Sequence, residues 1–290
     1  MVTARVFHRD GLALKLHDSG GDGPAVVMQH GLCGAEGQIA ELVPADLAAR
    51  LGLRRLTLEC RGHGGSEAGD PAAFSIATFA DDLAAALDAL SIRGAILGGV
   101  SMGAAIASRL AVRRPDLVSA LVLMRPAWVS ASAPDNMAPN LAVGRLLAAH
   151  PPGEARALFE ASPLARRLAT EAPDNLASLD GFFSREPVAV TSALLTAISL
   201  DGPGISDEEI ASIAVPALVI GHDLDVVHPF GHAERLAALI PGARLARITP
   251  KGIDKARYLA EFGRAFEAFV TALPAGRSSG ATPASSNNGT

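Results

Sequence analysis

Short apolar segments alternate along the chain with longer amphipathic segments. In the amphipathic segments at residues 79–90, 104–114 and 232–240, apolar residues recur at intervals of three and four, which predicts helices. The apolar segments are rich in β-branched residues and predict strands at residues 4–9, 12–18, 25–30, 55–60, 94–100, 119–124, 217–222 and 243–248. Because strands and helices alternate, we expect an α/β fold with a mostly parallel sheet covered by helices on both faces.

One long interval of the chain lacks a convincing strand. Residues 126–206 contain only helix-like segments separated by Pro, Asn and Asp, and the clearest are residues 140–150, 153–161 and 187–200. An all-helical insertion of this length inside an alternating pattern predicts a cap over one end of the sheet.

The chain is therefore predicted to divide into a core, a cap and a tail. We assign residues 1–125 and 207–274 to the α/β core and residues 126–206 to the helical cap. Residues 275–290 are mainly Gly, Ser, Ala and Asn without periodicity, which predicts a disordered tail. A chain of 290 residues is long enough for one large α/β domain with such an insertion.

Charge and composition argue against several classes of partner. The formal net charge is only −5 and the 25 Lys and Arg are scattered, so neither nucleic acid nor an acidic membrane surface is an expected partner. No apolar run approaches the roughly 20 residues of a membrane span, and the first residues lack the apolar core of a signal peptide. We therefore expect a cytoplasmic protein. Cys33 and Cys60 cannot form a disulfide framework, and we favour reduced thiols over a single bridge between them.

Ser101 is the strongest candidate for a catalytic residue. It lies in the pattern Gly99-Val100-Ser101-Met102-Gly103, between a buried strand and a helix. A tight turn from strand to helix requires small neighbours and presents the serine hydroxyl above the sheet at a helix N-terminus, where developing negative charge is stabilised. Because glycine is abundant in this chain, a glycine-rich turn with a chance serine is the alternative.

A second segment could supply the donors that such a serine requires. The strand at residues 25–30 leads into His30-Gly31 and a loop whose backbone N–H groups are free to point at a reacting carbonyl oxygen. The N–H groups of Leu32 and Met102 would then form a two-donor oxyanion hole. The same residues also fit an ordinary loop in which glycine serves only the turn.

The third segment, TLECRGHGGSEA at residues 57–68, is again a strand followed by a glycine-rich loop. These three segments, in this order and at these spacings, resemble the α/β-hydrolase superfamily, and the resemblance covers essentially residues 5–273. It implies a mostly parallel eight-stranded sheet and an active site under a helical cap inserted after the sixth strand. It also implies that His30 and His63 support loops rather than transfer protons. Glu59 departs from the family, in which aspartate is usual before R-G-H-G.

The resemblance places the catalytic acid after the seventh strand. An acidic residue four positions before a proline is typical of the family, and this spacing selects Asp225, ahead of Pro229, over Asp223. An ionised carboxylate at this position orients a histidine and stabilises its protonated form. An aspartate that merely caps a helix is the alternative interpretation.

The family histidine is missing from this sequence. The resemblance places it near Gly252 or Ile253, or as late as Tyr258, but no histidine follows His232. A serine hydroxyl is a poor nucleophile unless a neighbouring base takes its proton. Removal of one triad member typically leaves only the catalysis provided by binding and the oxyanion hole.

Three explanations for the missing histidine stay open. The first is a displaced histidine, His228 or His232, although both are expected on an exposed first helical turn. The second is a lysine base, because Lys251 lies in the loop where histidine is expected and desolvation can lower the pKa of a lysine. The third is that the pocket does not hydrolyse its ligand at all.

Arg125 is a candidate substrate-binding residue. It follows the sixth strand, at the carboxyl edge of the sheet where open α/β sheets bind ligands. A guanidinium there can hold a carboxylate or phosphate through two hydrogen bonds, or it can pair with an acidic cap residue such as Asp135.

Two classes of function follow from the sequence. The first is a hydrolase for an ester, lactone or related small carbonyl substrate, with an atypical or incomplete triad around Ser101 and Asp225. The second is a non-hydrolytic enzyme, such as a lyase or isomerase, or an inactive ligand-binding protein that uses the same pocket. In both cases we expect a small-molecule substrate or ligand, which can carry a carboxylate, and neither a metal ion nor a cofactor. The oligomeric state stays open.

Overall fold

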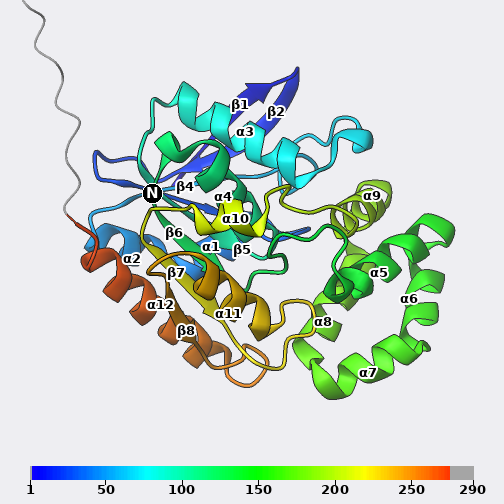
Figure 1. The fold of residues 1–290 in the computed structure, drawn as a ribbon. Coiled ribbons are helices and arrows are strands. Elements are labelled where there is room, and N and C mark those ends of the chain that lie inside the picture. Colours follow the sequence, from blue (N-terminus) through cyan, green and yellow to red (C-terminus); the bar gives the residue numbers. More distant parts are fainter. Residues whose placement is uncertain (1, 275–290) are drawn as a thin grey trace, which may run out of the picture.

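The computed structural model describes residues 2–274, so the predicted tail lies outside the described residues. Its centre is a single sheet of eight strands in the order β1-β2-β4-β3-β5-β6-β7-β8 (Figure 1). The strands are β1 (Thr3–Arg9), β2 (Leu12–Asp18), β3 (Ala25–Gln29), β4 (Arg54–Leu58), β5 (Ala95–Val100), β6 (Val118–Met124), β7 (Ala217–Gly221) and β8 (Arg244–Arg247). Pairs involving β1 or β2 are antiparallel and all others are parallel, so the predicted sheet is confirmed.

Helices cover both faces of this sheet, and alternate residues of the central strands enter two separate hydrophobic cores. Leu121 and Leu123 of β6 face one core, whereas Val122 and Met124 face the other. The first core is closed by α3 (Ile76–Ala89), α4 (Met102–Arg113) and α11 (Phe230–Leu239), and the second by α1 (Glu36–Leu42), α2 (Ala45–Arg50) and α12 (Lys255–Thr271). Burial on both faces explains why the parallel strands read as continuous apolar runs.

The chain between β6 and β7 is helical and contains no strand in the described structure. Its helices are α5 (Ala138–Ala149), α6 (Pro152–Glu160), α7 (Pro163–Glu171), α8 (Pro173–Gly181), α9 (Val188–Ser199) and, just before β7, the short α10 (Asp207–Ala211). Figure 1 shows α5 to α8 in an arc beside one end of the sheet. Helices α5 to α9 share a hydrophobic cluster of their own, which includes Phe159, Leu179 and Leu195.

The helices α7 and α8 are not among the clearest helical segments that the sequence predicts in this interval. We interpreted the prolines in this interval as breaks between helices. In the structure, Pro152, Pro163 and Pro173 each occupy the first turn of a helix, where a missing N–H costs nothing and a fixed φ favours the helical conformation.

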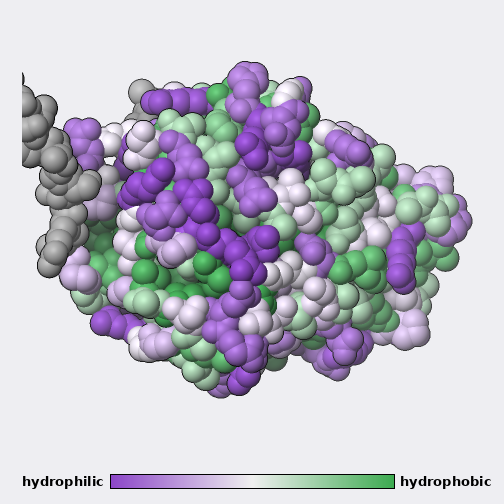
Figure 2. Space-filling view, turned by 45° about the horizontal axis from the view of Figure 1, so that its top comes forward, coloured by the Kyte–Doolittle hydropathy of each residue, from purple (hydrophilic) through white to green (hydrophobic). Residues whose placement is uncertain are grey.

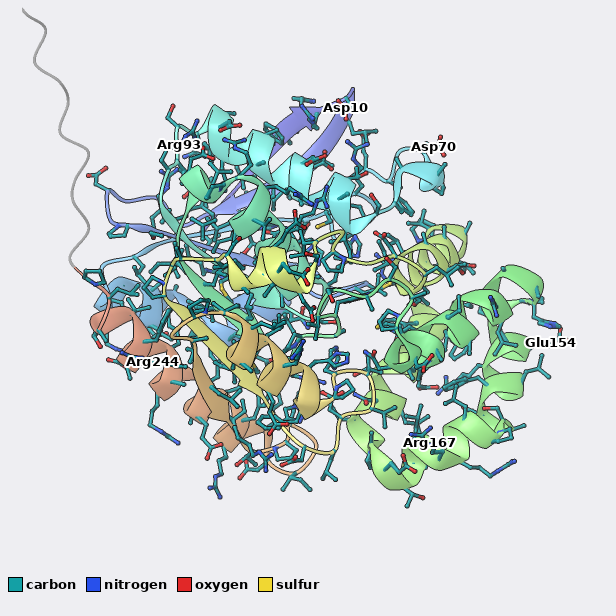
Figure 3. The ribbon with its side chains drawn as sticks, viewed as in Figure 1. Asp10, Asp70, Arg93, Glu154, Arg167 and Arg244 are labelled. Atoms are coloured by element: carbon teal, nitrogen blue, oxygen red, sulfur yellow. The ribbon has the colours of Figure 1, made fainter. Side chains whose placement is uncertain are left out.

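Charges of both signs are interspersed on the outer surface. Asp10, Asp70, Arg93, Glu154, Arg167 and Arg244 mark this distribution in Figure 3, and the space-filling view in Figure 2 shows hydrophilic and hydrophobic residues mixed on one face. Many surface charges pair locally, as in Arg167 with Glu171 on α7. Within residues 2–274, no helix combines the length and the apolar character needed to cross a membrane.

Candidate active site

Ser101 lies on the turn between β5 and α4 in a strained backbone conformation. Its φ of 56° and ψ of −111° place a non-glycine residue in the left-handed half of conformational space. The glycines around it have no room for a side chain. A Cβ on Gly99 would lie 2.5 Å from the carbonyl carbon of Gly103, and a Cβ on Gly103 would lie 2.2 Å from the Gln29 carbonyl oxygen. Close packing of β3, β5 and α4 therefore explains the glycine pattern around this serine.

The loop after β3 lies directly against Ser101. A Cβ built on Gly31 would lie 3.5 Å from the Ser101 Cβ, an ordinary van der Waals distance, so the loop packs against the serine. The Gly31 N–H donates to Gln38 Oε1 at 2.7 Å, which fixes the loop. The N–H groups of Leu32 and Met102, by contrast, donate to no acceptor within the described residues.

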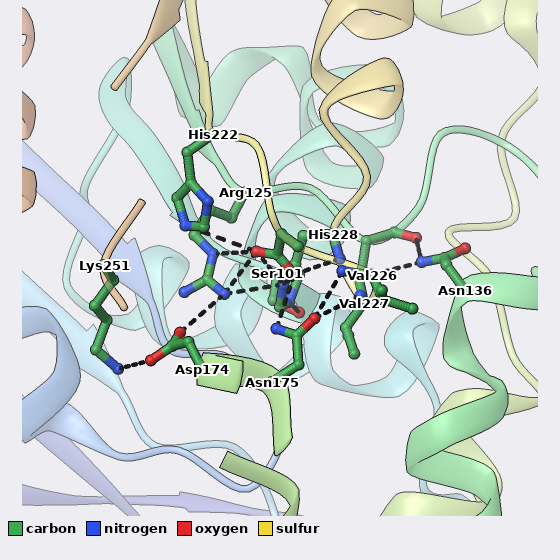
Figure 4. Close-up of polar contacts among 12 residues, drawn as sticks. Ser101, Arg125, Asn136, Asp174, Asn175, His222, Val226, Val227, His228 and Lys251 are labelled. Carbon is green, nitrogen blue, oxygen red and sulfur yellow. Dashed lines mark hydrogen bonds and ion pairs between the residues drawn. The ribbon is translucent and has the colours of Figure 1, made fainter. Parts of the chain in front are cut away.

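A histidine contacts the serine. His228 Nε2 lies 2.9 Å from Ser101 Oγ, and the two residues are 127 positions apart in sequence. On its other side, His228 Nδ1 lies 2.9 and 3.0 Å from the two carboxylate oxygens of Asp225. The backbone N–H of His228 also donates to Asp225 Oδ1 at 2.9 Å. The carboxylate and the imidazole therefore belong to one turn that follows β7, and this turn carries the imidazole to Ser101 (Figure 4).

The proton of the neutral imidazole is assigned to Nδ1. An ionised carboxylate only accepts hydrogen bonds, so an unprotonated Nδ1 at 2.9 Å would oppose its lone pair to that of Asp225. Arg125 Nη2 also lies 3.2 Å from this nitrogen, but the guanidinium is paired with the Asp225 carboxylate: its Nε donates to Oδ2 at 2.8 Å, and its Nη2 lies 2.7 Å from the same oxygen. With the proton on Nδ1, Nε2 presents its lone pair to the Ser101 hydroxyl.

Burial and neighbouring charges set the protonation of this turn. Burial lowers the pKa of His228 below its ordinary 6.5; the carboxylate of Asp225 opposes this change and the charge of Arg125 reinforces it. Burial alone would raise the pKa of Asp225, but His228 and Arg125 hold it well below 3.8. At neutral pH the site therefore contains an ionised Asp225 and a neutral His228.

Two asparagines from the inserted helical segment bind the backbone of the same turn. Asn175 Oδ1, on α8, accepts the N–H groups of Val226 at 2.7 Å and Val227 at 3.1 Å. Asn136 Nδ2 donates to the Val227 carbonyl at 2.7 Å. A buried donor that loses its partner costs about 1–3 kcal/mol, so these side chains stabilise a turn that has no regular secondary structure.

Comparison with known proteins places this geometry in a family. The model of the alpha/beta hydrolase fold matches residues 24–252. The chain belongs to the α/β-hydrolase family. It is 32% identical over 231 residues to RutD of Klebsiella pneumoniae strain 342, provisionally named a carbamate hydrolase, with 76% of this chain and 81% of that protein covered. It is 33% identical over 242 residues to BpoC of Mycobacterium tuberculosis, provisionally named a non-heme bromoperoxidase, with coverages of 81% and 89%.

Solved structures show the same α/β-hydrolase fold. The enol-lactonase from Burkholderia xenovorans LB400 superposes with a TM-score of 0.68 at 24% identity, and the match covers 90% of this chain and 98% of the enol-lactonase. Membership in a family of hydrolases supports the expectation that this chain is an enzyme. The resemblance inferred from the HG, RGHGGS and GVSMG segments is thereby confirmed at the level of the family.

The other candidate bases lie apart from the serine of this α/β-hydrolase. Lys251 lines the same cavity as Ser101, but its Nζ lies 3.5 Å from Asp174 Oδ1, with which it forms an ion pair. His232 is half-buried on α11, and no hydrogen bond or ion pair joins it to Ser101 or Asp225. Of the three replacement bases that the sequence suggested, only His228 contacts the serine hydroxyl.

The loop after β8, where the resemblance predicts a histidine, reaches the cavity only with Lys251. A Cβ on Gly252 would lie 3.2 Å from the Asp174 Cβ, so this loop packs against the start of α8. Ile253 is 69% exposed. Tyr258 is buried on α12 with its ring edge-on to His222, 5.8 Å between ring centroids. None of these three positions is placed beside the serine.

Arg125 lies at the carboxyl end of β6, but its charge is already paired. Its Nη2 lies 2.7 Å from Asp225 Oδ2 and 3.7 Å from Asp174 Oδ2. Asp135, the partner that we had considered from the sequence, forms no ion pair with it. Asp174 is the acidic residue between β6 and β7 that lies at ion-pair distance from Arg125, whereas the pairing with Asp225, 100 positions away in the chain, was not predicted from the sequence.

His30, His63 and Glu59 are buried in the loops behind the site. His30 Nε2 accepts the N–H of Cys60 at 3.1 Å, and His63 Nδ1 lies 2.9 Å from the Arg61 carbonyl. The Glu59 carboxylate accepts the N–H groups of Glu36 and Gly65 at 3.0 and 2.7 Å, so the longer side chain holds two loops together where the family has aspartate. Cys33 and Cys60 are free thiols.

The cavity at Ser101 is small and has a mixed lining. Its volume is about 110 Å³. Apolar side chains from α8 and its neighbourhood, including Leu179 and Phe182, face polar ones, including Asn140 and Ser178. A larger hollow of about 480 Å³ lies among α6, α7 and α8, but its lining contains neither Ser101 nor His228.

Proposed function

We propose that this protein is a serine hydrolase in which His228, not a residue after β8, activates Ser101. The observation that carries the proposal is the continuous contact from Asp225 through His228 to Ser101, with 2.9 Å at each step. These distances lie within the reach that general-base catalysis requires. The proposed substrate is a small ester, lactone or carbamate, because relatives and structural neighbours carry names of carbamate hydrolases, lactonases and esterases.

The proposed reaction proceeds through an acyl-enzyme. Ser101 Oγ attacks the substrate carbonyl carbon while His228 Nε2 takes the hydroxyl proton, and Asp225 stabilises the imidazolium that forms. The N–H groups of Leu32 and Met102 donate to the oxygen that becomes negative. His228 then gives its proton to the leaving group. In the second half, His228 removes a proton from water, whose oxygen attacks the acyl carbon. The bond from that carbon to Ser101 Oγ then breaks, His228 returns the proton to Oγ, and the acid product leaves.

The charges around the cavity favour an uncharged acyl group. Arg125 pairs with Asp225, and Lys251 pairs with Asp174, so each cation near the serine has a carboxylate partner. A substrate carboxylate would have to displace one of these pairs and compete with a carboxylate that is already in place. The small volume of the cavity favours a compact acyl group. We therefore propose a neutral, compact acyl group in place of the carboxylate-bearing substrate considered from the sequence.

The alternative functions rested on the absence of a base. A ligand-binding protein or a non-hydrolytic enzyme was attractive because no histidine follows β8. With His228 Nε2 2.9 Å from Ser101 Oγ, that motive no longer applies. No other described feature of the site favours a ligand-binding or non-hydrolytic function.

The test of this proposal is covalent labelling together with turnover. A fluorophosphonate probe should form an adduct at Ser101, located by peptide mass spectrometry, and p-nitrophenyl acetate should be hydrolysed. Both activities should disappear in Ser101→Ala and fall strongly in His228→Ala. His232→Ala is the matched control, because this histidine lies four residues further along without contacting the serine, and it should retain both activities. Absence of an adduct at Ser101 in the folded unmodified protein would overturn the proposal.

A further inference from the structure

The catalytic turn proposed above obtains much of its support from outside the core. It runs from Asp225 to His228 and follows β7 without regular secondary structure. Leu224, just before it, has a φ of 58°, so the backbone enters the turn in a conformation that few side chains favour. Within the turn, only the N–H of His228 donates to the turn's own carboxylate. The neighbouring N–H groups need partners from elsewhere.

Asn175 provides those partners with one side chain. Its Oδ1 accepts the N–H groups of both Val226 and Val227, and its Nδ2 donates to Asp225 Oδ1 at 2.9 Å. The side chain is buried, with 2% of the residue exposed. One carboxamide therefore fixes the backbone of the turn and the orientation of the carboxylate together. Through that carboxylate it also fixes the imidazole.

The first turn of α8 brings Asn175 to this position. Its neighbour Asp174 lies 3.7 Å from Arg125 Nη2 after β6 and 3.5 Å from Lys251 Nζ after β8. Figure 4 shows Asp174 and Asn175 side by side, one facing Lys251 and the other facing the turn. The start of α8 thus contacts the loops after β6, β7 and β8, all at the same edge of the sheet.

We propose that Asn175 is a positioning residue, through which docking of α8 holds His228 against Ser101. This inference rests on the proposed function. When α8 is docked, Asn175 holds the turn in the conformation that reaches the serine. When α8 moves away, the turn loses three hydrogen bonds from one side chain, and the base loses its alignment. Binding of a substrate under α8 and activation of the nucleophile are therefore coupled through one residue.

A negative charge placed at position 175 should raise the pKa of His228. The charged and titratable groups that face this imidazole are Arg125 after β6, Asp174 on α8, His222 at the end of β7, Asp225 on its own turn and His232 on α11. In Asn175→Asp, the carboxylate still accepts the two backbone N–H groups but adds a negative charge beside Asp225. A negative charge favours the protonated imidazole. The loss of activity on acidification should then begin at a higher pH than in the unmodified protein.

The experiment measures the second-order rate of fluorophosphonate labelling at Ser101 between pH 5 and pH 8, together with kcat and KM for p-nitrophenyl acetate. Asn175→Ala should slow labelling by about 10- to 100-fold, the range expected when a catalytic group is misplaced by about 1 Å. The fall should appear in kcat, with KM changing by less than about threefold, because the alignment of the base is lost rather than the binding of substrate. In Asn175→Asp, the fall of the labelling rate on acidification should begin at a higher pH than in the unmodified protein.

Asn140→Ala is the matched control. Asn140 is also a buried asparagine of the inserted helices and lines the same cavity, but no hydrogen bond joins it to the turn. In Asn140→Ala, the labelling rate should fall at the same acidic pH as in the unmodified protein. Any loss of catalytic efficiency should appear as a change in KM. Thermal melting followed by circular dichroism checks that each variant is folded. If Asn175→Ala is not folded, the position of the acid limb in Asn175→Asp tests the inference.

Two outcomes separate this inference from the proposed function. If the unmodified protein is labelled at Ser101 and both Asn175 variants keep its rate and its acid limb, Asn175 does not position the base, although the serine hydrolase stands. If the unmodified protein is not labelled, the proposed function fails and the role of Asn175 fails with it. The inference is supported if Asn175→Ala is labelled more slowly and the acid limb of Asn175→Asp lies at a higher pH than that of the unmodified protein.

Discussion

The loops after β7 and β8 lie at the same edge of one sheet, yet they differ in what they bring to Ser101. The β7 loop carries an acid and a histidine three positions apart, and its imidazole reaches the serine. The β8 loop carries Lys251, which pairs with Asp174, and then turns outward at Ile253. Proximity to the edge is therefore not sufficient. The β7 turn differs in that buried hydrogen bonds from Asn175 hold it.

The largest expected effect distinguishes the two loops directly. His228→Ala should lower kcat for p-nitrophenyl acetate by at least about 10³-fold, since loss of a triad base leaves mainly the oxyanion hole and binding. Lys251→Met, which removes the cation of the β8 loop, should lower kcat by less than about tenfold because its amine is paired away from the serine. Steady-state kinetics on both variants decide between them. The opposite ranking would identify the β8 loop as the source of the base.

A histidine placed in the β8 loop should not restore the activity that is lost with His228. In the double variant His228→Ala with Ile253→His, the new imidazole stands at a position that is 69% exposed and does not line the cavity. We expect kcat to stay at the level of His228→Ala alone. Recovery of activity in this variant would show that the β8 loop can bend inward, and it would remove the contrast between the loops.

Arg125 is expected to give the next largest effect, on stability and on pH dependence together. Arg125→Met leaves the carboxylate of Asp225 buried without its cation, which typically costs about 3–5 kcal/mol in the free energy of unfolding. Because the Arg125 charge lowers the pKa of His228, its removal should raise that pKa and shift the acid limb of kcat/KM upward. Urea unfolding and a pH–rate profile measure the two effects. A stable variant with an unchanged acid limb would contradict the pairing.

In the unmodified protein, activity should persist at acid pH. Only the neutral imidazole can accept the serine proton, and burial lowers the pKa of His228 below 6.5. As the pH falls, kcat/KM should therefore decline at a pH below 6.5, whereas a histidine with an ordinary pKa would lose half its activity at 6.5. A pH–rate profile in buffers of constant ionic strength tests this, and a midpoint above 6.5 would contradict it.

The smallest expected effect concerns the β8 loop alone. The Lys251–Asp174 pair is partly exposed, with a 3.5 Å separation between Nζ and Oδ1. Lys251→Met should therefore change the free energy of unfolding by no more than about 1 kcal/mol. Thermal melting measures the difference, and a loss as large as that of Arg125→Met would show that the β8 loop is held as firmly as the β7 loop.

Much of the fold could be predicted from the sequence because local patterns of apolar residues and glycines indicate it. The strands of the parallel sheet are buried on both faces and appear as apolar runs, and the glycines around Ser101 follow from close backbone packing. The helices α7 and α8 were not among the clearest predicted helical segments, since proline marks both the start of a helix and a break. The sequence alone does not distinguish these two uses.

The base of the candidate site was less accessible for a different reason. His228 precedes Pro229 and a helix, a pattern that indicates an exposed first turn, and this made it a weak candidate. Its burial depends on Asn175, 50 positions before Asp225, and on Arg125, 100 positions before it. Such distant contacts leave no periodic trace in the sequence. The Asp225–His228 spacing was visible from the start, but only the structure shows that both side chains point inward.

The single turn from Asp225 to His228 also makes the proposed acid and base a portable unit. Both groups lie within a segment short enough to be exchanged by one insertion in a gene. In another sheet of this kind, the same segment would still need the partners that it has here, an asparagine for its backbone and an arginine for its carboxylate. The β8 loop then needs to supply no catalytic residue, and what it contributes to the site is the contact of Lys251 with Asp174 at the start of α8.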